Sequence, residues 1–561
     1  MMREIPIEKN DDIEFTIDAL GSEGQGIGRV DGYTVFVPLA LPGEKIRAHV
    51  IKTTSGYGVA KLTEVMEPSK DRAQQDCPAY PRCGGCSMRH MSYAAQLAAK
   101  TKQVRDAFIR LGRFDGSEIN VQPCRGMEHP DRYRNKGSFP YGYDENHCIV
   151  PGFFSPRSHR IVPIADCPIQ SENIMAAVRV VTDWAREYNI TPYDEQKRCG
   201  LLRHCMVRES SSGVIVMVVT AGKLPHDIEL VEMLRASIPH LIGVVHNLNK
   251  ADTNIILGNR FTTLWGNERL PVTVCGHSFQ VSMPSFLQVN PVQTEVLYSY
   301  ALDFLDLNGG ERVADVYCGI GTITLMLAEH AKEVIGIECV PEAISDANRS
   351  ASENGIANAK FICGNAEDVL PRLVSSGTKL DCAVIDPPRK GCDEAVLKAL
   401  AQSGVSRIVY ISCNPATLAR DCRMLADMGY CVEKIQPVDM FPWTYHVETV
   451  VLLSHKKPDS HINIKVEFGE GEGKVPLKAI AERAEAYKPK ERVTYKMIKE
   501  YIEAKYGFKV HTAYIAEVKR DLGLPMYDAP NAVEELKNPR KHPTAEKVEA
   551  IKDALKYFEV I

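Results

Sequence analysis

Alternation of apolar and polar residues marks the first part of the chain. Apolar side chains recur at every second position in Ile13, Phe15 and Ile17, and glycine-rich turns such as residues 21–28 separate such runs. A period of two between glycine turns is typical of short antiparallel strands. The pattern predicts a small OB-like β-barrel over residues 7–66, a fold that serves either as a structural module or as a binder of single-stranded nucleic acid.

The pattern changes after residue 285, where short apolar runs alternate with helical segments. The apolar runs lie at residues 312–316, 333–338, 380–386 and 408–411. Continuous apolar runs separated by helices are typical of parallel strands that are buried on both faces. We therefore expect an α/β multidomain protein, with a Rossmann-like domain over residues 285–456 and a central α+β domain over residues 67–284.

The last hundred residues follow a third pattern. The glycine and glutamate stretch at residues 467–473 is typical of a linker. Beyond it, residues 495–505 and 512–521 are expected to form two helices, separated by a turn at Gly507. We expect a small helical domain over residues 474–561. Its charges are nearly balanced, so a contact with RNA, a contact with an assembly partner and a purely structural role all stay open.

Composition and charge narrow the functional classes. The chain has 561 residues and a net charge of −5, from 67 Lys+Arg against 72 Asp+Glu, so a surface for nucleic acid must be local. The first residues are charged, and no apolar run approaches the roughly 18 residues that a membrane span needs. The 17 scattered cysteines, without a secretion signal, favour a reducing compartment. We expect a monomeric cytoplasmic protein that makes no membrane contact.

Three cysteines lie close together in the segment that follows the predicted barrel. Cys77, Cys83 and Cys86 stand on proline and glycine turns, and Cys167 comes much later in the chain. Four thiolates satisfy either a tetrahedral zinc ion or a four-iron cluster. Zinc ribbons usually pair two Cys-x2-Cys knuckles, so three clustered ligands with one remote cysteine favour iron and sulfur.

Two strand ends predict a cofactor site. Asp315 ends one apolar run and is followed by Gly319 and Gly321, and the next run ends in Glu338. Glycines at the first strand-to-helix turn let the backbone approach a ligand, and an acidic residue about twenty positions on accepts hydrogen bonds from ribose hydroxyls. An NAD fingerprint has a third glycine where this chain has Thr324. We therefore favour S-adenosylmethionine over NAD.

Two further strand ends predict the chemistry. Asp386 opens an Asp-Pro-Pro sequence that resembles the base-facing motif of nucleobase methyltransferases, and Cys413 follows the apolar run 408–411. Exocyclic adenine nitrogens need no protein nucleophile, whereas carbon 5 of uracil stays unreactive until a nucleophile such as a thiolate adds to carbon 6. A base must then remove the proton from carbon 5. Glu448 is the candidate base, and His446 competes with it.

With these motifs the chain resembles a known family. Gly24, Gly26, Gly28 and residues 41–44 (Leu-Pro-Gly-Glu) resemble a TRAM domain, an RNA-binding module of tRNA and rRNA modification enzymes. Residues from about 10 to 456 are similar to the RNA uracil-5-methyltransferases. The similarity is specifically to the TRAM-containing, iron–sulfur branch that acts on 23S ribosomal RNA, which implies 5-methyluridine as the product.

The resemblance implies roles for particular residues. Cys413 would be the nucleophile, Glu448 the base, and Phe286 would lie against the target base. The residues expected to contact S-adenosylmethionine are Gln288, Tyr317, Glu338 and Asp386. The residues expected to hold a [4Fe-4S] cluster are Cys77, Cys83, Cys86 and Cys167. Asn365 is expected near the adenine, whereas Thr322 stands where relatives can carry a cofactor-binding asparagine, which puts a contact there in doubt.

Two basic runs also match the family, residues 133–136 (Tyr-Arg-Asn-Lys) and 202–208 (Leu-Arg-His-Cys-Met-Val-Arg). Their arginines and lysine would neutralise phosphates, and tyrosine or histidine would stack on unpaired bases. Three other hypotheses stay open: a transfer RNA uridine as the target, a non-catalytic RNA-binding ribosome-assembly factor, and a small-molecule methyltransferase. The joint presence of Cys413, Glu448 and Asp386 argues against the assembly factor, and the barrel argues against a small-molecule substrate.

Overall fold

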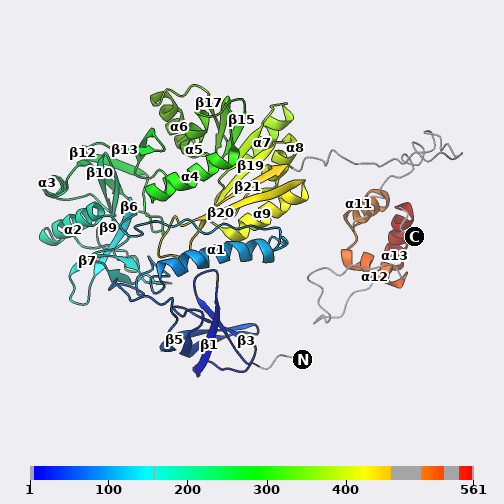
Figure 1. Ribbon diagram of the computed structural model, residues 1–561, viewed down its shortest axis with the longest axis horizontal. Coiled ribbons are helices and arrows are strands. Elements are labelled where there is room, and N and C mark those ends of the chain that lie inside the picture. The colour runs from blue at the N-terminus through cyan, green and yellow to red at the C-terminus, as the bar shows by residue number, and fades with distance from the viewer. Residues whose placement is uncertain (1–4, 157, 456–494, 523–542, 559–561) are drawn as a thin grey trace, which may run out of the picture. The chain divides into compact units, whose positions relative to one another are not determined.

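Two compact units make up the chain in the computed structural model, Met1–His461 and Ile462–Ile561 (Figure 1). The structure describes residues 5–156, 158–455, 495–522 and 543–558. The predicted linker at residues 467–473 lies outside the described residues. Within the described ranges, no helix combines the length and the apolar character that crossing a membrane requires.

A closed five-stranded barrel forms the N-terminal part of the first unit (Figure 1). Its strands are β1 (Asp12–Leu20), β2 (Gly26–Val30), β3 (Tyr33–Val37), β4 (Lys45–Thr53) and β5 (Tyr57–Glu67). They pair in the order β1-β2-β3-β5-β4, and only the β3 and β5 pair is parallel. Alternate residues such as Val35 and Val37 point into the barrel and form its core. The predicted barrel is confirmed.

A seven-stranded sheet follows the barrel. Its strands are β6 (Lys136–Tyr143), β7 (Ile149–Phe154), β8 (Ile161–Pro163), β9 (Leu202–Ser210), β10 (Gly213–Thr220), β11 (Leu241–Leu248) and β12 (Arg260–Gly266). They lie in the order β12-β11-β10-β9-β6-β7-β8. Helices α2 (Glu172–Glu187) and α3 (Asp227–Ser237) contribute side chains such as Trp184 and Leu230 to the core on one face. The central strand β10 is buried along its whole length, because both of its faces are covered.

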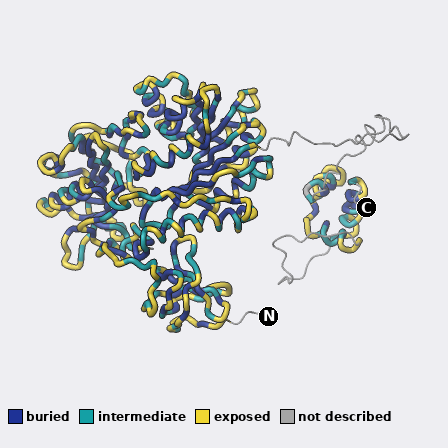
Figure 2. The backbone as a smooth tube through the Cα atoms, in the orientation of Figure 1, coloured by how far each residue is buried: buried dark blue, intermediate teal, exposed yellow. Residues whose placement is uncertain are grey.

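The second seven-stranded sheet is a doubly wound α/β sheet. Its strands are β15 (Arg312–Val316), β16 (Glu333–Glu338), β17 (Ala359–Cys363), β18 (Cys382–Ile385), β19 (Arg407–Ser412), β20 (Tyr430–Val438) and β21 (Glu448–His455). They lie in the order β17-β16-β15-β18-β19-β21-β20, and the first five are parallel. Strand β21 runs antiparallel to both of its neighbours. Buried residues run through the middle of this sheet (Figure 2).

Helices follow most strands of this sheet and cover its faces. They are α4 (Pro291–Leu305), α5 (Thr322–Ala328), α6 (Pro341–Glu353), α7 (Ala366–Ser375), α8 (Glu394–Ser403) and α9 (Pro415–Asp427). The alternation of parallel strands and helices confirms the predicted Rossmann-like architecture. It also brings the carboxyl ends of β15, β16, β18 and β19 to one edge, which is where doubly wound sheets bind ligands.

Helix α1 (Tyr93–Arg110) joins the core of this second sheet. Its Val104, Ala107 and Phe108 are buried with residues of β20 and α9. The chain after α1 continues along the edge of the sheet, where Val121 forms a parallel bridge with Ile435. A segment that lies in the predicted central range is therefore packed with the later α/β part of the chain.

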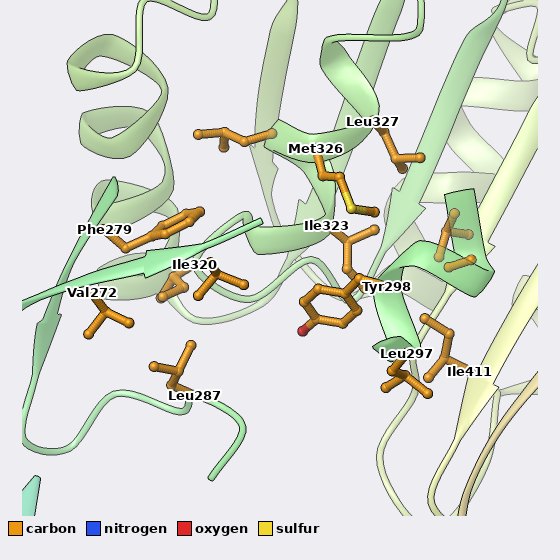
Figure 3. Packing of buried hydrophobic residues seen from close by; sticks show 14 of the residues in the cluster. Val272, Phe279, Leu287, Leu297, Tyr298, Ile320, Ile323, Met326, Leu327 and Ile411 are labelled. Carbon is orange, nitrogen blue, oxygen red and sulfur yellow. The ribbon is translucent and has the colours of Figure 1, made fainter. Parts of the chain in front are cut away.

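A two-stranded hairpin contributes to the buried cluster on the other face of this sheet (Figure 3). Its strands are β13 (Arg269–Val274) and β14 (His277–Ser282). Val272 and Phe279 of the hairpin belong to the same buried cluster as Leu297 of α4 and Ile323 of α5. Helix α4 is thereby enclosed between the hairpin and the sheet, and the loop that leads into it is fixed on both sides.

The second unit is a small helical body. Its helices are α11 (Tyr495–Tyr506), α12 (Thr512–Asp521) and α13 (Ala545–Tyr557). Ile502, Ile515 and Leu555 lie in one buried cluster that all three helices share. The first two helices match the sequence prediction, and α13 was not predicted.

Candidate active site

Cys413 lies in the turn between β19 and α9. The strand ends here because Pro415 lacks the backbone donor that a continued ladder would need. Asn414 caps the helix, and its side-chain oxygen accepts a hydrogen bond from the Ala416 amide at 3.1 Å. This cap fixes the turn and leaves the Cys413 thiol half-buried at the carboxyl edge of the sheet.

The segment that follows β18 runs beside this turn. Its Arg389 carbonyl accepts hydrogen bonds from Asn414 Nδ2 at 3.1 Å and from Thr417 Oγ1 at 3.4 Å. Because β18 and β19 are adjacent and parallel, Asp386 and Cys413 stand at the ends of neighbouring strands. The Asp-Pro-Pro segment and the cysteine turn therefore form one surface.

Glu448 is the first residue of β21 and approaches from the opposite direction. Strand β21 is antiparallel to β19, and Thr449 pairs with Ser412, so Glu448 falls next to Cys413. Its side chain is only 5% exposed. The pKa of Glu448 is raised to about 8, because burial and the nearby Asp386 favour the protonated form more than Arg389 opposes it.

The pKa values of Asp386 and Cys413 are raised as well. Burial raises the pKa of Asp386 to about 7, with a further contribution from Asp315. Burial and then Glu448 raise the pKa of Cys413 to about 11, while Arg389 favours the thiolate. Three groups with pKa values raised by burial and mutual repulsion at one sheet edge make this edge the candidate catalytic site.

Arg389 was not among the residues selected from the sequence. Its side chain is exposed and acts electrostatically on Cys413, Glu448 and His446. Its position in the sequence could have indicated a role at the site, because Arg389 directly follows the Asp-Pro-Pro motif. A cation at the mouth of a site that contains two carboxyl groups and a thiol would stabilise an anion formed there.

His446 lies at the same end of the sheet as Glu448. Burial lowers the pKa of His446, and the positive charges of Arg389 and Lys100 lower it further. Its imidazole is therefore neutral at pH 7 and contacts the Tyr445 ring, with 4.3 Å between the ring centroids. Glu448 acts electrostatically on the thiol and is strongly buried, whereas His446 is half-buried and shares with the thiol the influence of Arg389.

The glycine turn after β15 lies beside the end of β16. Gly319 donates its amide to Glu338 Oε2 at 3.2 Å, and Val340 donates to Glu338 Oε1 at 3.0 Å. Tyr317 has a φ of 70°, a left-handed conformation that is uncommon for a bulky residue and clusters at functional sites. The structure therefore brings together the predicted glycine turn, Tyr317 and Glu338.

A buried carboxyl group lies beneath this turn. Asp315 is fully buried, and its Oδ2 accepts a hydrogen bond from Thr324 at 2.5 Å. Its Oδ1 has no hydrogen-bond partner among the described residues. Burial raises the pKa of Asp315 to about 7. An unpartnered buried oxygen below a glycine turn is the feature expected where a polar ligand completes the site.

The loop between β14 and α4 forms another side of the site. Asn135 holds it from the central sheet, since its amide donates to the Val289 carbonyl at 2.9 Å and its side chain to the Gln288 carbonyl at 3.3 Å. Gln288 is buried, whereas Phe286 is 77% exposed. An exposed aromatic ring on a fixed loop next to this edge is suited to stack on a base.

Comparison with family models identifies two parts of the chain. Residues 8–63 match the TRAM domain, and residues 229–456 match the family described as tRNA (Uracil-5-)-methyltransferase. An uncharacterised RNA methyltransferase of Halalkalibacterium halodurans is 47% identical over 457 residues, which cover 81% of this chain and 99% of that protein. One of Clostridium tetani is 42% identical over 458 residues, again 81% and 99%.

The chain belongs to the RNA uracil-5-methyltransferase family. A solved structure agrees, the Pyrococcus abyssi tRNA (uracil-54, C5)-methyltransferase in complex with S-adenosyl-L-homocysteine. It is 27% identical, has a TM-score of 0.64, and the match covers 78% of this chain and 99% of that one. The predicted TRAM domain, methyltransferase fold and RNA uracil-5-methyltransferase activity are thereby confirmed.

Two further residues were selected through the family resemblance. Asn365 caps α7, and its side chain donates to Asp368 Oδ2 at 3.3 Å. Thr322 begins α5, and its hydroxyl lies 3.4 Å from the hydroxyl of Tyr298. Both side chains already have partners within the chain, and their cofactor contacts stay predictions.

The four cysteines of this methyltransferase converge on one cavity. Cys77, Cys83, Cys86 and Cys167 all line a space of about 250 Å³, together with Arg89, Arg134 and Lys136. Burial raises the pKa of Cys86 to about 12, and the charges of the other three cysteines contribute. However, no group of three or more His, Cys, Asp or Glu side chains within the described ranges could hold a metal ion. The iron–sulfur cluster is not confirmed.

The basic run at residues 202–208 does not form an RNA surface. It lies in β9, a buried strand, where Arg208 is 2% exposed and donates to the Ser285 carbonyl at 2.6 Å. His204 is buried as well, and so is Tyr133 of the other run, whose hydroxyl donates to the Pro442 carbonyl at 3.2 Å. The predicted stacking of this histidine and this tyrosine on bases was therefore wrong. Arg208 and Tyr133 instead donate hydrogen bonds to the loops around the site.

Proposed function

We propose that this enzyme methylates carbon 5 of a uridine in 23S ribosomal RNA through a covalent adduct between Cys413 and carbon 6. The observation that carries the proposal is the pair of acids beside the Cys413 thiol at one sheet edge, the half-buried Asp386 and the buried Glu448. Both have raised pKa values, and neither side chain has a hydrogen bond or ion pair within the described part of the chain. Carbon 5 methylation needs a nucleophile and then a base with proton affinity near neutral pH, and this set supplies both.

The thiol and the base act in sequence on the uracil ring. The RNA is opened and the uridine enters the site, where Phe286 offers an exposed aromatic face. The Cys413 thiol loses its proton to solvent, and the thiolate adds to carbon 6 as the double bond between carbons 5 and 6 opens. Arg389 at the mouth of the site balances the charge of the resulting enolate. After carbon 5 is methylated, Glu448 accepts its proton and the carbon 6 to sulfur bond breaks. His446 is the second candidate for this base.

The methyl donor that fits the site is S-adenosylmethionine, which supplies a methyl group activated by a sulfonium charge. The glycine turn of Gly319 and the carboxylate of Glu338 would hold its adenosine part, with Tyr317 and Gln288 beside it. Asp386 would balance the positive charge. Support comes from the unpartnered Asp315 oxygen below the turn and from the solved relative in complex with S-adenosyl-L-homocysteine.

The cavity of Cys77, Cys83, Cys86 and Cys167 suits a [4Fe-4S] cluster better than a single ion. A cluster ligated by four thiolates is larger than one ion and carries net negative charge, and Arg89, Arg134 and Lys136 line the same cavity. Such a cluster would fix the segment after the barrel to the segment of Cys167. Its role would be structural.

The choice of 23S ribosomal RNA over transfer RNA is the finer part of the proposal. It rests on the combination of TRAM barrel and four-cysteine cavity, which is shared with the ribosomal branch that the sequence resembles. A transfer RNA uridine is the second candidate, because the similar Pyrococcus abyssi protein is a tRNA (uracil-54, C5)-methyltransferase. Both substrates use the same site.

The test uses 5-fluorouridine-substituted 23S RNA fragments and transfer RNA with S-adenosylmethionine. Fluorine on carbon 5 cannot leave as a proton does, so the adduct stays bonded to the enzyme. We expect a complex on 23S RNA that survives denaturing electrophoresis with the wild type and with the control Cys431→Ala, but not with Cys413→Ala. A complex on transfer RNA alone would show that the substrate is transfer RNA. No complex on either RNA would overturn the covalent mechanism.

A further inference from the structure

The loop of residues 439–447 connects β20 to β21 and leads directly into Glu448. At its start Asp439 is buried in an ion pair with Lys100. Its second half carries Tyr445 and the candidate base His446, and it ends at the edge where Cys413 lies. Because Glu448 is the first residue of its strand, the path of this loop decides where its carboxyl group points.

The second half of the loop is held by the segment that follows Cys86. The amides of Ser87 and Met88 both donate to the Trp443 carbonyl at 3.0 Å. In return the Tyr445 amide donates to Ser87 Oγ at 3.0 Å. The Ser87 carbonyl accepts a hydrogen bond from the Tyr80 hydroxyl at 3.2 Å. The amide and the hydroxyl oxygen of Ser87 therefore join the cysteine segment to this loop, while its carbonyl is held within the cysteine segment.

Arg89 supports the same contact through the Trp443 side chain. Its guanidinium lies 4.5 Å from the centre of the Trp443 ring, and its side chain is 1% exposed. Asp76 and Asp131 hold the guanidinium in place, at 2.5 Å and 3.1 Å. Trp443 has a φ of 68°, a conformation that persists in a bulky residue only where its surroundings impose it.

From these contacts we propose that Ser87 and Arg89 are positioning residues for Glu448, and that they couple the four-cysteine cavity to the removal of the carbon 5 proton. Cys86, which lines the cavity, is the chain neighbour of Ser87. A shift of the cysteine segment is transmitted to the loop before Glu448 through three hydrogen bonds and the contact of Arg89 with the Trp443 ring. This inference rests on the proposed covalent mechanism and extends it to a region outside the methyltransferase sheet.

The step that depends on this coupling is the last one of the reaction. Glu448 takes the proton from carbon 5 of the methylated adduct, and the electron pair of that bond forms the double bond between carbons 5 and 6. The bond from carbon 6 to the Cys413 sulfur breaks at the same time, and the sulfur leaves as a thiolate. Misplacement of the base slows this elimination without preventing the addition of the thiol, so the adduct accumulates.

The experiment uses the full chain and RNA with ordinary uridine. Ser87→Ala removes the oxygen that accepts from the Tyr445 amide and leaves the cysteines unchanged. Ser87→Thr keeps that oxygen and serves as the conservative rescue. Ser299→Ala on the exposed face of α4 is the matched control, and Glu448→Gln is the reference for a lost base. Adduct is measured by denaturing electrophoresis during turnover, and folding by thermal unfolding.

We expect adduct to accumulate on ordinary uridine with Ser87→Ala, with product release slowed on the order of tenfold, as for the loss of one hydrogen bond. The ratio kcat/KM for RNA should stay unchanged, because the slowed step follows the irreversible methyl transfer. Ser87→Thr and Ser299→Ala should resemble the wild type. Release at the wild-type rate, or loss of adduct formation itself, would overturn the inference. The wild type is tested with 5-fluorouridine RNA in parallel, because absence of that adduct would reject the proposed function instead.

Discussion

Two buried acids lie at the two ends of one loop, and they differ in their partners. Asp439, at the start of the loop, forms an ion pair with Lys100 and accepts a hydrogen bond from the Tyr93 hydroxyl at 2.8 Å. Glu448, which follows the loop, has no side-chain hydrogen bond or ion pair within the described ranges, and its neighbour Asp386 raises its pKa further. One carboxylate is fully paired, whereas the other is left with a high proton affinity.

The difference in partners distinguishes a carboxylate with a structural role from one suited to act as a general base. A buried charge that is paired and hydrogen-bonded keeps its ionised form and fixes the groups around it, and removal of one partner is strongly destabilising. A buried carboxyl group without donors binds a proton near neutral pH, which is the property that a general base requires. Burial alone thus does not distinguish the two roles, but the partners do.

We expect the largest effect, a loss of methyl transfer, from removal of the thiol beside Glu448. Cys413→Ala should lower methyl transfer to RNA by about 10⁴-fold or more, because uracil then lacks the nucleophile that activates carbon 5. Transfer of labelled methyl groups measures the rate, and thermal unfolding should be nearly unchanged because the thiol is only half-buried. Residual activity within tenfold of the wild type would show that the thiol is dispensable.

Breaking the ion pair of Asp439 should lower the stability of the folded state and not the rate of the chemical steps. Lys100→Met leaves Asp439 buried without its cation and should destabilise the folded state by about 3–5 kcal/mol. Denaturant unfolding measures the change, with the exposed Lys102→Met as control, since its pairing with Asp106 is on the surface and contributes less than about 1 kcal/mol. Equal effects of the two substitutions would remove the distinction between paired and exposed charge.

The buried carboxyl group of Glu448 should make the free energy of unfolding depend on pH. Since Glu448 has a folded pKa of about 8, above its unfolded value, the folded state binds more protons and its stability falls as pH rises between these values. Between pH 6 and 8 this group should cost about 2 kcal/mol of unfolding free energy, and Glu448→Gln should remove that part of the slope. Unfolding curves of both proteins at several pH values check this, and parallel slopes would contradict it.

The smallest effect concerns RNA binding at the open side of the site. Phe286→Ala should raise KM for RNA about tenfold, because stacking on one base contributes on the order of 1–3 kcal/mol, and should leave unfolding unchanged since the ring is exposed. Ile228→Ala, an equally exposed apolar residue on α3, is the control in the same assay. An unchanged KM would exclude stacking by Phe286.

Strand ends could be predicted from the sequence because they follow local rules. Cys413, Asp386 and Glu338 each come directly after an apolar run, and parallel strands bring their carboxyl ends to one edge. The Lys100 and Asp439 pair could not be predicted, because its members are 339 positions apart and no local pattern joins them. Arg208 was misjudged because a basic residue in a short run gives no sign that the strand is buried.

The pairing of Lys100 with Asp439 has a consequence for synthesis of the chain on the ribosome. At about 5–20 residues per second, Lys100 emerges roughly 20–70 s before its partner is made. Throughout that interval α1 presents Val104, Ala107 and Phe108 without the strands that later bury them. A fragment that begins after α1 would therefore lack part of the core of the α/β sheet.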